Sequence, residues 1–287
     1  MNISFVVLHY NNVQATQRCV KSLLKYKGAS IIIVDNGSPN GKAKEIDKML
    51  LRKDNVYLIE SDKNLGFAKG NNIGYQFAKN NLHSDVIVLS NNDVYFEQID
   101  FLKILEKYVA NRDVDIAGPK IFLGNSDENE NPIPRQIHNK KDIYIRMLKD
   151  TILLIANYFN GMDLFVSHLF GDPSKKHLNV DNSLVSDYQL HGSCLIFANR
   201  YVKERNGLYD KTFMYGEENI LRYIADFYDY KMKYISELYV RHQEGGSSDG
   251  TYEGNKFKRR FRYKNGLKSE QKLLALMQNN NLMRYIN

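Results

Sequence analysis

Cysteine is scarce in this sequence of 287 residues. Its two cysteines, Cys19 and Cys194, are too few for a disulfide framework, and no CxxC or Cys/His pair has metal-binding spacing. This scarcity predicts a reducing, intracellular setting. The N-terminus begins with an apolar run but lacks the basic flank and small-residue cleavage site of a secretory signal. We therefore expect a cytoplasmic protein.

Long hydrophobic runs are also missing. Crossing a bilayer takes about 20 apolar residues, and the best candidate, Thr151 to Phe170, is interrupted by Asn157, Asn160, Gly161 and Asp163. We therefore expect no membrane span. With 43% apolar and 25% charged residues, the composition is that of a globular protein, which excludes collagen-like, low-complexity and largely disordered classes.

Two common phosphate-binding motifs are absent as well. There is no GxGxxG after the first apolar run and no GxxxxGK[ST] anywhere in the chain. The sequence therefore lacks the main evidence for a dinucleotide-dependent dehydrogenase or a P-loop NTPase. Nucleotide binding in this chain needs a different chemistry.

Through residue 118, short apolar runs alternate with amphipathic segments, which predicts an α/β fold with an open, mainly parallel sheet flanked by helices. The runs lack polar alternation, as in strands covered on both faces. The predicted strands are Ile3–His9, Ser30–Val34, Val56–Ile59, Val86–Leu89 and Val114–Ala117. The predicted helices are Val13–Lys25, Lys42–Leu51, Ala68–Asn80 and Ile99–Val109.

This pattern fails from residue 124 to about 187, where we predict a partly helical insertion. Within Asp142–Phe159 an apolar stripe is typical of a core or of a subunit contact, so a homodimer is one expectation. The stripe consists of Tyr144, Leu148, Ile152, Ile155 and Phe159. Regular structure is expected again at Leu190–Ala198, in a helix after Gly216 and in a strand around Lys233–Ile235. The predicted organisation is a nucleotide-binding half (1–123), an insertion (124–187), a second half of the same domain (188–250) and a basic helical tail (251–287).

Polar residues follow each of the first four predicted strands, at the edge where open α/β sheets bind ligands. Asp35 could accept a hydrogen bond from the imide N–H of uracil or thymine, although Asp35–Ser38 equally fits a turn and helix cap. The loop Asn64–Asn72 has glycines at 66 and 70 that permit close approach to a ligand, or it is simply a tight turn. The segments after the strands are His9–Asn12, Asp35–Ser38, Ser61–Asn72 and Asn91–Asp93.

Three further sites carry ionisable side chains. Asp93 could be a ligand of a hard divalent cation or a helix cap. Glu217 and Glu218 stand at a predicted helix start, where the dipole favours the ionised form that a general base requires; ordinary first-turn acids are the alternative. His242 follows an apolar run, and a lone histidine is usually structural.

Taken in order, these segments resemble the inverting family 2 glycosyltransferases with the GT-A fold, particularly the rhamnosyltransferase-like branch of bacterial surface-polysaccharide enzymes. Val6–Asn12 resembles the family's first strand and its TYN loop, and Leu89–Asp93 stands where its DXD-like motif falls. The other matching segments are Ile33–Ser38 (VDNGS), Asn64–Asn72 (NLGFAxGNN), His191–Ile196 (SGACLL), Phe213–Asn219 (FFMYGED) and His242 with Gly245–Ser248 (H…GGSS).

The resemblance implies a nucleoside-diphosphate sugar donor, linked to dTDP or UDP, and a metal-dependent transfer to a saccharide or lipid-linked saccharide. Asp93 and His242 would hold Mg²⁺ or Mn²⁺, and Glu218, or else Glu217, would be the base. The donor-binding residues would be His9, Tyr10, Asn11, Asp35, Asn36, Asn64, Gly66, Phe67, Ala68, Gly70, Asn71, Asn91 and Asn92. A nucleotidyltransferase and a non-catalytic sugar-binding module remain the alternatives. Release of nucleoside diphosphate rather than pyrophosphate would exclude the first, and metal-dependent donor hydrolysis would exclude the second.

The tail concentrates the net charge of +7: Lys256–Lys268 holds seven cations and no acid, interleaved with aromatic residues. Such a block suits nucleic acid, an anionic membrane surface or a solvated helix face. Because the resemblance implies a lipid-linked acceptor, we expect peripheral contact with the inner face of the cell membrane and no nucleic acid partner.

Overall fold

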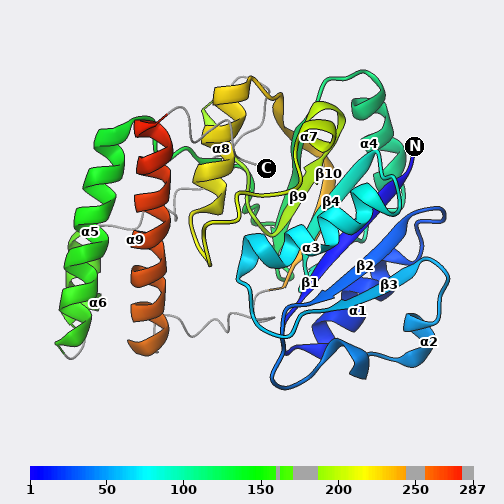
Figure 1. Cartoon of the computed structure of the whole chain (residues 1–287), viewed down its shortest axis with the longest axis horizontal. Coiled ribbons are helices and arrows are strands. Elements are labelled where there is room, and N and C mark those ends of the chain that lie inside the picture. The colour runs from blue at the N-terminus through cyan, green and yellow to red at the C-terminus, as the bar shows by residue number, and fades with distance from the viewer. Residues whose placement is uncertain (160–161, 171–186, 244–255, 280–287) are drawn as a thin grey trace.

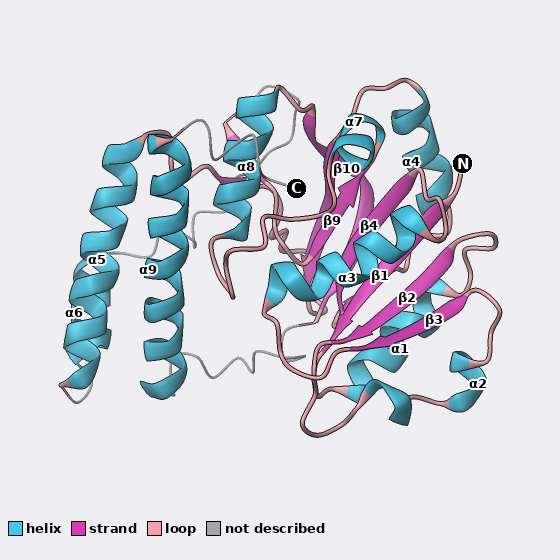
Figure 2. Cartoon of the chain, viewed as in Figure 1, coloured by secondary structure: helices cyan, strands magenta, loops and turns pink. Residues whose placement is uncertain are grey.

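One mixed sheet forms the centre of the protein. A computed structural model describes residues 1–159, 162–170, 187–243 and 256–279 (Figure 1). In the eight-stranded sheet the spatial order is β3-β2-β1-β4-β9-β6-β10-β5, with helices packed on its faces (Figure 2). The strands are β1 (Ile3–His9), β2 (Ser30–Asp35), β3 (Val56–Glu60), β4 (Val86–Asn91), β5 (Val94–Tyr95), β6 (Ile116–Leu123), β9 (Cys194–Phe197) and β10 (Met232–His242).

Most strand pairs are parallel, as predicted. β3, β2, β1 and β4 pair in parallel, and so do β6 and β10. β9 runs antiparallel between β4 and β6, and the short β5 pairs antiparallel with β10. The sequence predicted regular structure at Leu190–Ala198 but not that its strand lies in the middle of the sheet.

Two hydrophobic cores lie on the two faces of the sheet. Ile31 and Ile33 of β2 belong to the core beneath α1 (Val13–Leu23) and α4 (Phe101–Ala110). Ile32 and Val34 belong to the other core, beneath α3 (Phe67–Asn80), α7 (Asn199–Glu204) and α8 (Glu217–Tyr228). Since successive strand residues point to opposite faces, both cores require a continuous apolar run. This is why the apolar runs located β1 to β4. In contrast, β6 begins two residues later than predicted and extends to Leu123, β10 is longer than predicted, and β5 was not predicted.

The predicted helix Lys42–Leu51 is broken in two. A 3₁₀ turn, η1 (Ala43–Glu45), is followed by the single-turn helix α2 (Lys48–Leu51). Asp47 separates them, and its side chain accepts a hydrogen bond from the backbone N–H of Met49. An aspartate in this capping position starts a new helix rather than continuing the previous one.

The insertion and the tail form a helical layer beside the sheet (Figure 1). α5 (Lys140–Tyr158) packs against α9 (Lys256–Gln278), the predicted tail helix, and α6 (Met162–Phe170) follows α5. A Cβ atom on Gly266 of α9 would come within 2.8 Å of an Asp150 carboxylate oxygen on α5, so the glycine permits close packing. No helix in the described ranges is both long enough and apolar enough to cross a membrane.

The apolar stripe of α5 faces outward. Leu148 is 62% exposed, and Tyr144, Ile155 and Phe159 are also exposed. As a core stripe the prediction is therefore wrong; as a subunit contact it stays a prediction. The side that α5 buries carries Ile143, Leu153, Ala156 and Asn157.

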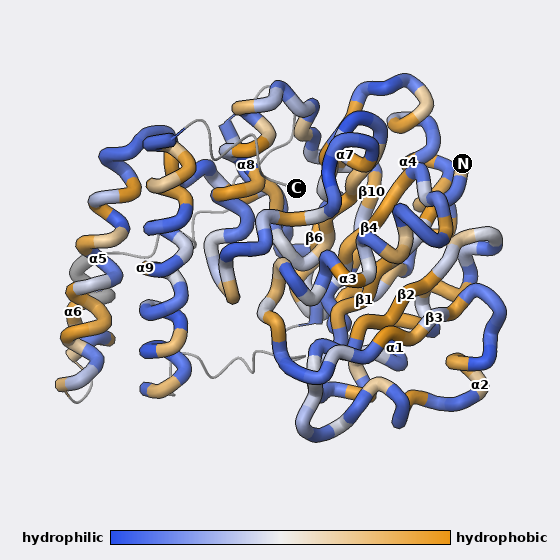
Figure 3. The backbone as a smooth tube through the Cα atoms, viewed as in Figure 1, coloured by the Kyte–Doolittle hydropathy of each residue, from blue (hydrophilic) through white to orange (hydrophobic). Residues whose placement is uncertain are grey.

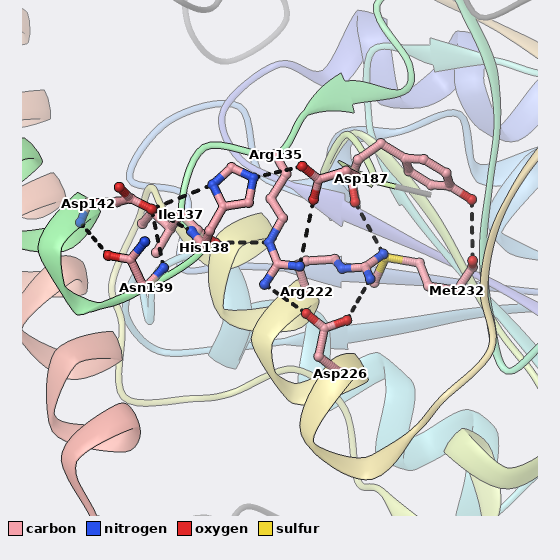
Figure 4. Close-up of polar contacts among 10 residues, drawn as sticks. Arg135, Ile137, His138, Asn139, Asp142, Asp187, Arg222, Asp226 and Met232 are labelled. Atoms are coloured by element: carbon pink, nitrogen blue, oxygen red, sulfur yellow. Dashed lines mark hydrogen bonds and ion pairs between the residues drawn. The ribbon is translucent and has the colours of Figure 1, made fainter. Parts of the chain in front are cut away.

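A polar network fixes the start of this layer to the sheet domain (Figure 4). Arg135 pairs with Asp226 of α8 at 2.8 Å, and His138 lies 2.7 Å from Asp187. Asn139 caps α5 by accepting hydrogen bonds from two backbone N–H groups. Nearby, β7 (Ile133–Pro134) and β8 (Tyr188–Gln189) pair as a second small sheet. The insertion is therefore anchored at both ends.

Candidate active site

Strand pairing brings Asp93 and His242 together. Val94 of β5 pairs with His242 at the end of β10, and Gln243 N–H donates to the Asp93 carbonyl oxygen at 3.0 Å. As a result, Nε2 of His242 lies 3.4 Å from Oδ1 of Asp93. These two residues, predicted from motifs 149 positions apart, meet at one point of the sheet edge.

A third ionisable side chain at this point, Glu130, was missed by the sequence analysis. Its Oε2 atom lies 2.7 Å from Nδ1 of His242. The segment before it folds back along β6, so that Glu130 N–H donates to the Ile121 carbonyl oxygen and Leu123 N–H to that of Glu128. Glu130 falls in the polar insertion, where no hydrophobic pattern or family motif marks it.

The two carboxylates control the charge of His242. Burial alone would lower the pKa of His242, but its contacts with Asp93 and Glu130 raise the pKa to about 10. Oδ1 of Asp93 is buried, and apart from its 3.4 Å contact with His242 it has no hydrogen-bond partner among the described residues. Asp93 and Glu130 thus place two carboxylates against one imidazole. Without a proton on His242, no side chain of this group of three would balance their negative charge.

The donor set fits a divalent cation. Asp93 offers a buried carboxylate oxygen whose polar neighbour is His242. His242, on losing its Nε2 proton to a cation, would offer that nitrogen, while its Nδ1 is held by Glu130. A carboxylate on the far side of a ligating histidine is the usual arrangement in metal sites. In the described ranges, no three His, Cys, Asp or Glu side chains converge as a metal cluster. A cation here would take two protein ligands, and phosphate oxygens could complete its coordination.

Glu217 and Glu218 have different environments at the start of α8. Glu217 is buried and accepts a hydrogen bond from the Thr212 hydroxyl at 3.1 Å. Burial, with the neighbouring charge of Glu218, raises the pKa of Glu217 to about 7. Glu218 is half-buried and lies so close to Gly192 that a Cβ atom there would come within 2.7 Å of its Oε1 atom.

The loop before β9 lies between Glu218 and the Asp93–His242 pair. The rings of His191 and His242 are 5.8 Å apart, and the carbonyl oxygen of Ser193 accepts a hydrogen bond from Asn91 N–H at 2.9 Å. Burial lowers the pKa of His191, whereas the charges of Glu130 and Glu218 act in the opposite direction. His191 is thus within electrostatic reach of both groups.

The predicted donor loop, Asn64–Asn72, lies against the segment around Phe213 that leads into α8. Phe67 N–H donates to the carbonyl oxygen of Phe213 at 2.7 Å, and a Cβ atom on Gly66 would overlap that oxygen. Asn36 holds the donor loop from the other side: its Nδ2 donates to Asn64 and to the Gly66 carbonyl oxygen, and its Oδ1 accepts from Leu65 N–H.

Two predicted donor-binding residues point into the protein instead. His9 is fully buried, with Nδ1 2.6 Å from the Thr16 hydroxyl and Nε2 2.8 Å from the Gly41 carbonyl oxygen. Asn92 is buried, and its Nδ2 donates to the same hydroxyl at 2.9 Å. Both side chains are hydrogen-bonded to α1 and its neighbouring turn, and a contact of either with a donor stays a prediction.

Asp35 makes the contacts of a turn. Its two carboxylate oxygens accept hydrogen bonds from Ser38 N–H at 2.9 Å and Ala43 N–H at 2.8 Å, and the residue is buried. The turn interpretation is confirmed by these contacts, and a nucleoside contact stays a prediction.

The remaining predicted residues lie on the surrounding loops. Asn11 is exposed next to the half-buried Tyr10, and Asn91 ends β4. Ala68, Gly70 and Asn71 are buried in the first turns of α3, where Oδ1 of Asn71 has no hydrogen-bond partner among the described residues. The predicted Gly245–Ser248 segment lies outside the described residues.

Comparison with solved structures defines the fold class as GT-A. Residues 1–349 of S. aureus TarS match 98% of this chain with a TM-score of 0.52 and 14% identity, covering 72% of that chain. GalNAc-T7, solved with UDP, GalNAc and Mn²⁺, matches 87% of this chain and 45% of its own at TM-score 0.57 and 13% identity. The mannosyltransferase PcManGT from Pyrobaculum calidifontis, solved with GDP-Man and Mn²⁺, matches 96% and 70% at TM-score 0.53 and 11% identity.

The family follows from the sequence comparison. The model of glycosyl transferase family 2 matches residues 4–169, which is more than half of the chain, so the chain belongs to this family. A curated relative, glycosyltransferase GlyG of Streptococcus pneumoniae serotype 4, is 26% identical over 130 residues. That match covers 45% of this chain and 41% of the relative, so the chain spans less than half of that relative's length.

Proposed function

We propose that the chain is a metal-dependent, inverting glycosyltransferase that moves a hexosyl group from a nucleoside-diphosphate sugar to a saccharide acceptor. One observation carries the proposal: a carboxylate–imidazole pair suited to a cation, Asp93 with His242, is joined through His191 to the glutamates at the start of α8. Family membership supports the reaction class, and GalNAc-T7 and PcManGT were both solved with Mn²⁺.

The residues have separable tasks in this proposal. Asp93 and His242 would hold Mg²⁺ or Mn²⁺, and such a cation would supply charge neutralisation for the leaving diphosphate. Glu130 orients the imidazole through its 2.7 Å contact. Asn36 holds the donor loop Asn64–Gly66 by its hydrogen bonds. This loop would line the sugar and diphosphate.

We assign the general base to Glu218. Glu217 is buried with a pKa raised to about 7, so it carries a proton for much of the time at neutral pH and is bonded to Thr212. Glu218 is more exposed and is directed at the Gly192 loop, where an acceptor hydroxyl can approach it. Two carboxylates with different environments commonly have different roles. Deprotonation by Glu218 and attack on the face opposite the leaving group invert the anomeric centre without a covalent intermediate.

The donor is a UDP- or dTDP-linked sugar in this proposal, and rhamnose is the family-level expectation. The acceptor is a saccharide or lipid-linked saccharide of a bacterial capsule or cell-wall polysaccharide, used at the cytoplasmic face of the membrane. GalNAc-T7 with UDP supports a uridine nucleotide, whereas PcManGT with GDP-Man makes GDP sugars a necessary comparison.

The test is a donor-hydrolysis screen. The full chain is incubated with UDP-, dTDP- and GDP-linked sugars in Mn²⁺ or in EDTA, and free nucleoside diphosphate is measured. We expect diphosphate release with one donor class in Mn²⁺ and its loss in EDTA. Asp93→Asn should reduce both donor binding and release, while Glu106→Gln, an exposed acid on α4, should change neither. Release of pyrophosphate, or no release with any donor, would contradict the proposal.

A further inference from the structure

The ends of three helices form a surface with apolar side chains outside and polar side chains inside. We call this surface the helical tip: Tyr158 and Phe159 at the end of α5, Met162 and Phe165 at the start of α6, and Phe257 at the start of α9. These five side chains are between 51% and 75% exposed. Figure 3 shows hydrophobic segments along the outer helices α5 and α6, away from the sheet.

The interior of the helical tip is a satisfied polar network. Asp163 is fully buried and pairs with Arg259, with an Oδ2 to Nε distance of 2.5 Å. Asn157, also fully buried, donates to Asp163 at 2.9 Å and to the Lys256 carbonyl oxygen at 3.2 Å. Arg260 donates to Asn157 at 3.0 Å. These bonds hold the three helix ends together. The Arg260 guanidinium also lies 3.8 Å from the centre of the Tyr158 ring, yet Tyr158 and the other four apolar side chains of the helical tip stay exposed.

Exposed apolar side chains gathered at one place are typical of a binding surface, and the charge around them indicates the partner. α9 contributes a block of cations, Lys256–Lys268, with no acid among them. Asp163, the acid of the helical tip, is buried against Arg259. A second copy of the chain in a two-fold contact would bring this cationic block against itself, which is unfavourable. An anionic lipid leaflet accepts both the apolar side chains and the cations.

The helical tip also leads to the catalytic loop. Phe261 lies one helical turn after Phe257, and its ring contacts those of Phe213 and Tyr215 at centroid distances of 6.1 and 6.4 Å. Phe213 and Tyr215 come immediately before Glu217 and Glu218. α9 therefore contacts the loop that leads directly into α8, whose first turn carries the proposed base.

We propose that the helical tip docks the protein on an anionic phospholipid leaflet, with Tyr158, Phe159, Met162, Phe165 and Phe257 inserted among the acyl chains and headgroups. The exposed and half-exposed cations of α9 bind the lipid phosphates, whereas Arg259 is held by Asp163 and Arg260 by Asn157. This inference deepens the proposed function. It rests on that function for one point only, namely that a lipid-linked acceptor reaches Glu218 from this surface.

The experiment measures co-sedimentation of the full chain with vesicles of phosphatidylcholine alone or mixed with phosphatidylglycerol. We expect binding to the mixed vesicles that weakens with salt. Lys258→Gln/Lys264→Gln/Lys268→Gln should weaken it about 100-fold, because each cation contributes about 1 kcal/mol at such a surface. Phe159→Ser/Phe165→Ser/Phe257→Ser should weaken it about tenfold or more.

Matched controls keep the outcomes distinct. Met49→Ser and Ile99→Ser remove exposed apolar residues from other elements and should leave binding unchanged. Hydrolysis of a soluble donor by each variant reports separately on the proposed function, and we expect it to be retained. The inference would be overturned if the wild-type protein did not co-sediment with the vesicles that contain phosphatidylglycerol. A phenylalanine variant that changes from dimer to monomer while its vesicle binding is unaltered would also overturn it, since the partner is then a second copy.

Discussion

Nδ1 of His242 lies 2.7 Å from Oε2 of Glu130, on the side of the imidazole opposite Asp93. This contact fixes the ring orientation, so that Nε2 faces the Asp93 carboxylate. The contact spans 112 residues and joins the insertion to the end of the central sheet. The insertion is therefore part of the site and not only an attachment to it.

Glu130→Gln should weaken Mn²⁺ binding by roughly 10- to 100-fold, as loss of a carboxylate behind a ligating histidine commonly does. Glu130→Asp should recover part of the affinity, because it keeps the charge on a shorter side chain. Titration of free Mn²⁺ by electron paramagnetic resonance measures the affinity without requiring turnover. Glu128→Gln, an exposed acid two residues away, is the control. Equal Mn²⁺ affinity in wild type and Glu130→Gln would show that Glu130 does not position His242.

Gly192→Ala should separate catalysis from stability. The new Cβ atom would come within 2.7 Å of Oε1 of Glu218, which is the end of a flexible side chain. The carboxylate can move aside at small cost, so we expect little change in Tm. A displacement of about 1 Å at a general base should reduce kcat by about 100-fold. Steady-state transfer assays and thermal unfolding on the same preparation test both halves; unchanged kcat would argue against Glu218 as the base.

Gly66→Ala should destabilise the fold strongly. Gly66 has φ +85°, and an added Cβ atom would lie 2.1 Å from the Phe213 carbonyl oxygen, a backbone atom. Gly28 has the same φ of +85° with nothing within 4 Å, so Gly28→Ala isolates the conformational cost. We expect Gly28→Ala to lower the free energy of unfolding by about 1 to 2 kcal/mol and Gly66→Ala by about 3 kcal/mol or more. Similar losses in urea unfolding would mean that the contact with Phe213 is not tight.

Glu217 should make stability fall as pH rises toward neutrality. Burial and the charge of Glu218 raise its pKa from 4.5 to about 7, so between these values the folded state binds more protons than the unfolded state. Neutral Glu217 is tolerated below this window, and its ionisation through the window destabilises the fold. Glu217→Gln removes the penalty. Its free energy of unfolding relative to wild type should therefore rise by about 3 kcal/mol between pH 4.5 and 7.5.

The measurement is urea unfolding of both proteins across that pH range. Glu106→Gln, at an exposed position, should give a difference that does not vary with pH. Parallel curves for wild type and Glu217→Gln would mean that the Glu217 side chain is not as protected from water as its contacts indicate.

Local sequence determined the strands, the main helices and the edge at which the site forms. Continuous Val- and Ile-rich runs of the right length suit strands buried on both faces, which is why β1 begins and ends at the predicted residues, Ile3 and His9. The segments around Asp93 and His242 follow from the same logic, since polar residues at the carboxyl ends of strands meet at one edge. Glu218 was predicted instead from a helix start and the family resemblance.

Tertiary structure decided which of those polar residues face the site. His9 and Asn92 follow strands as the others do, yet both bond to Thr16 beneath the site, because direction depends on packing against α1. Glu130 joins the site through backbone pairing along β6, which leaves no periodic signal in the sequence. The outward stripe of α5 is the same kind of case: helical spacing shows that a face is apolar, but only the neighbouring helices determine whether it is covered.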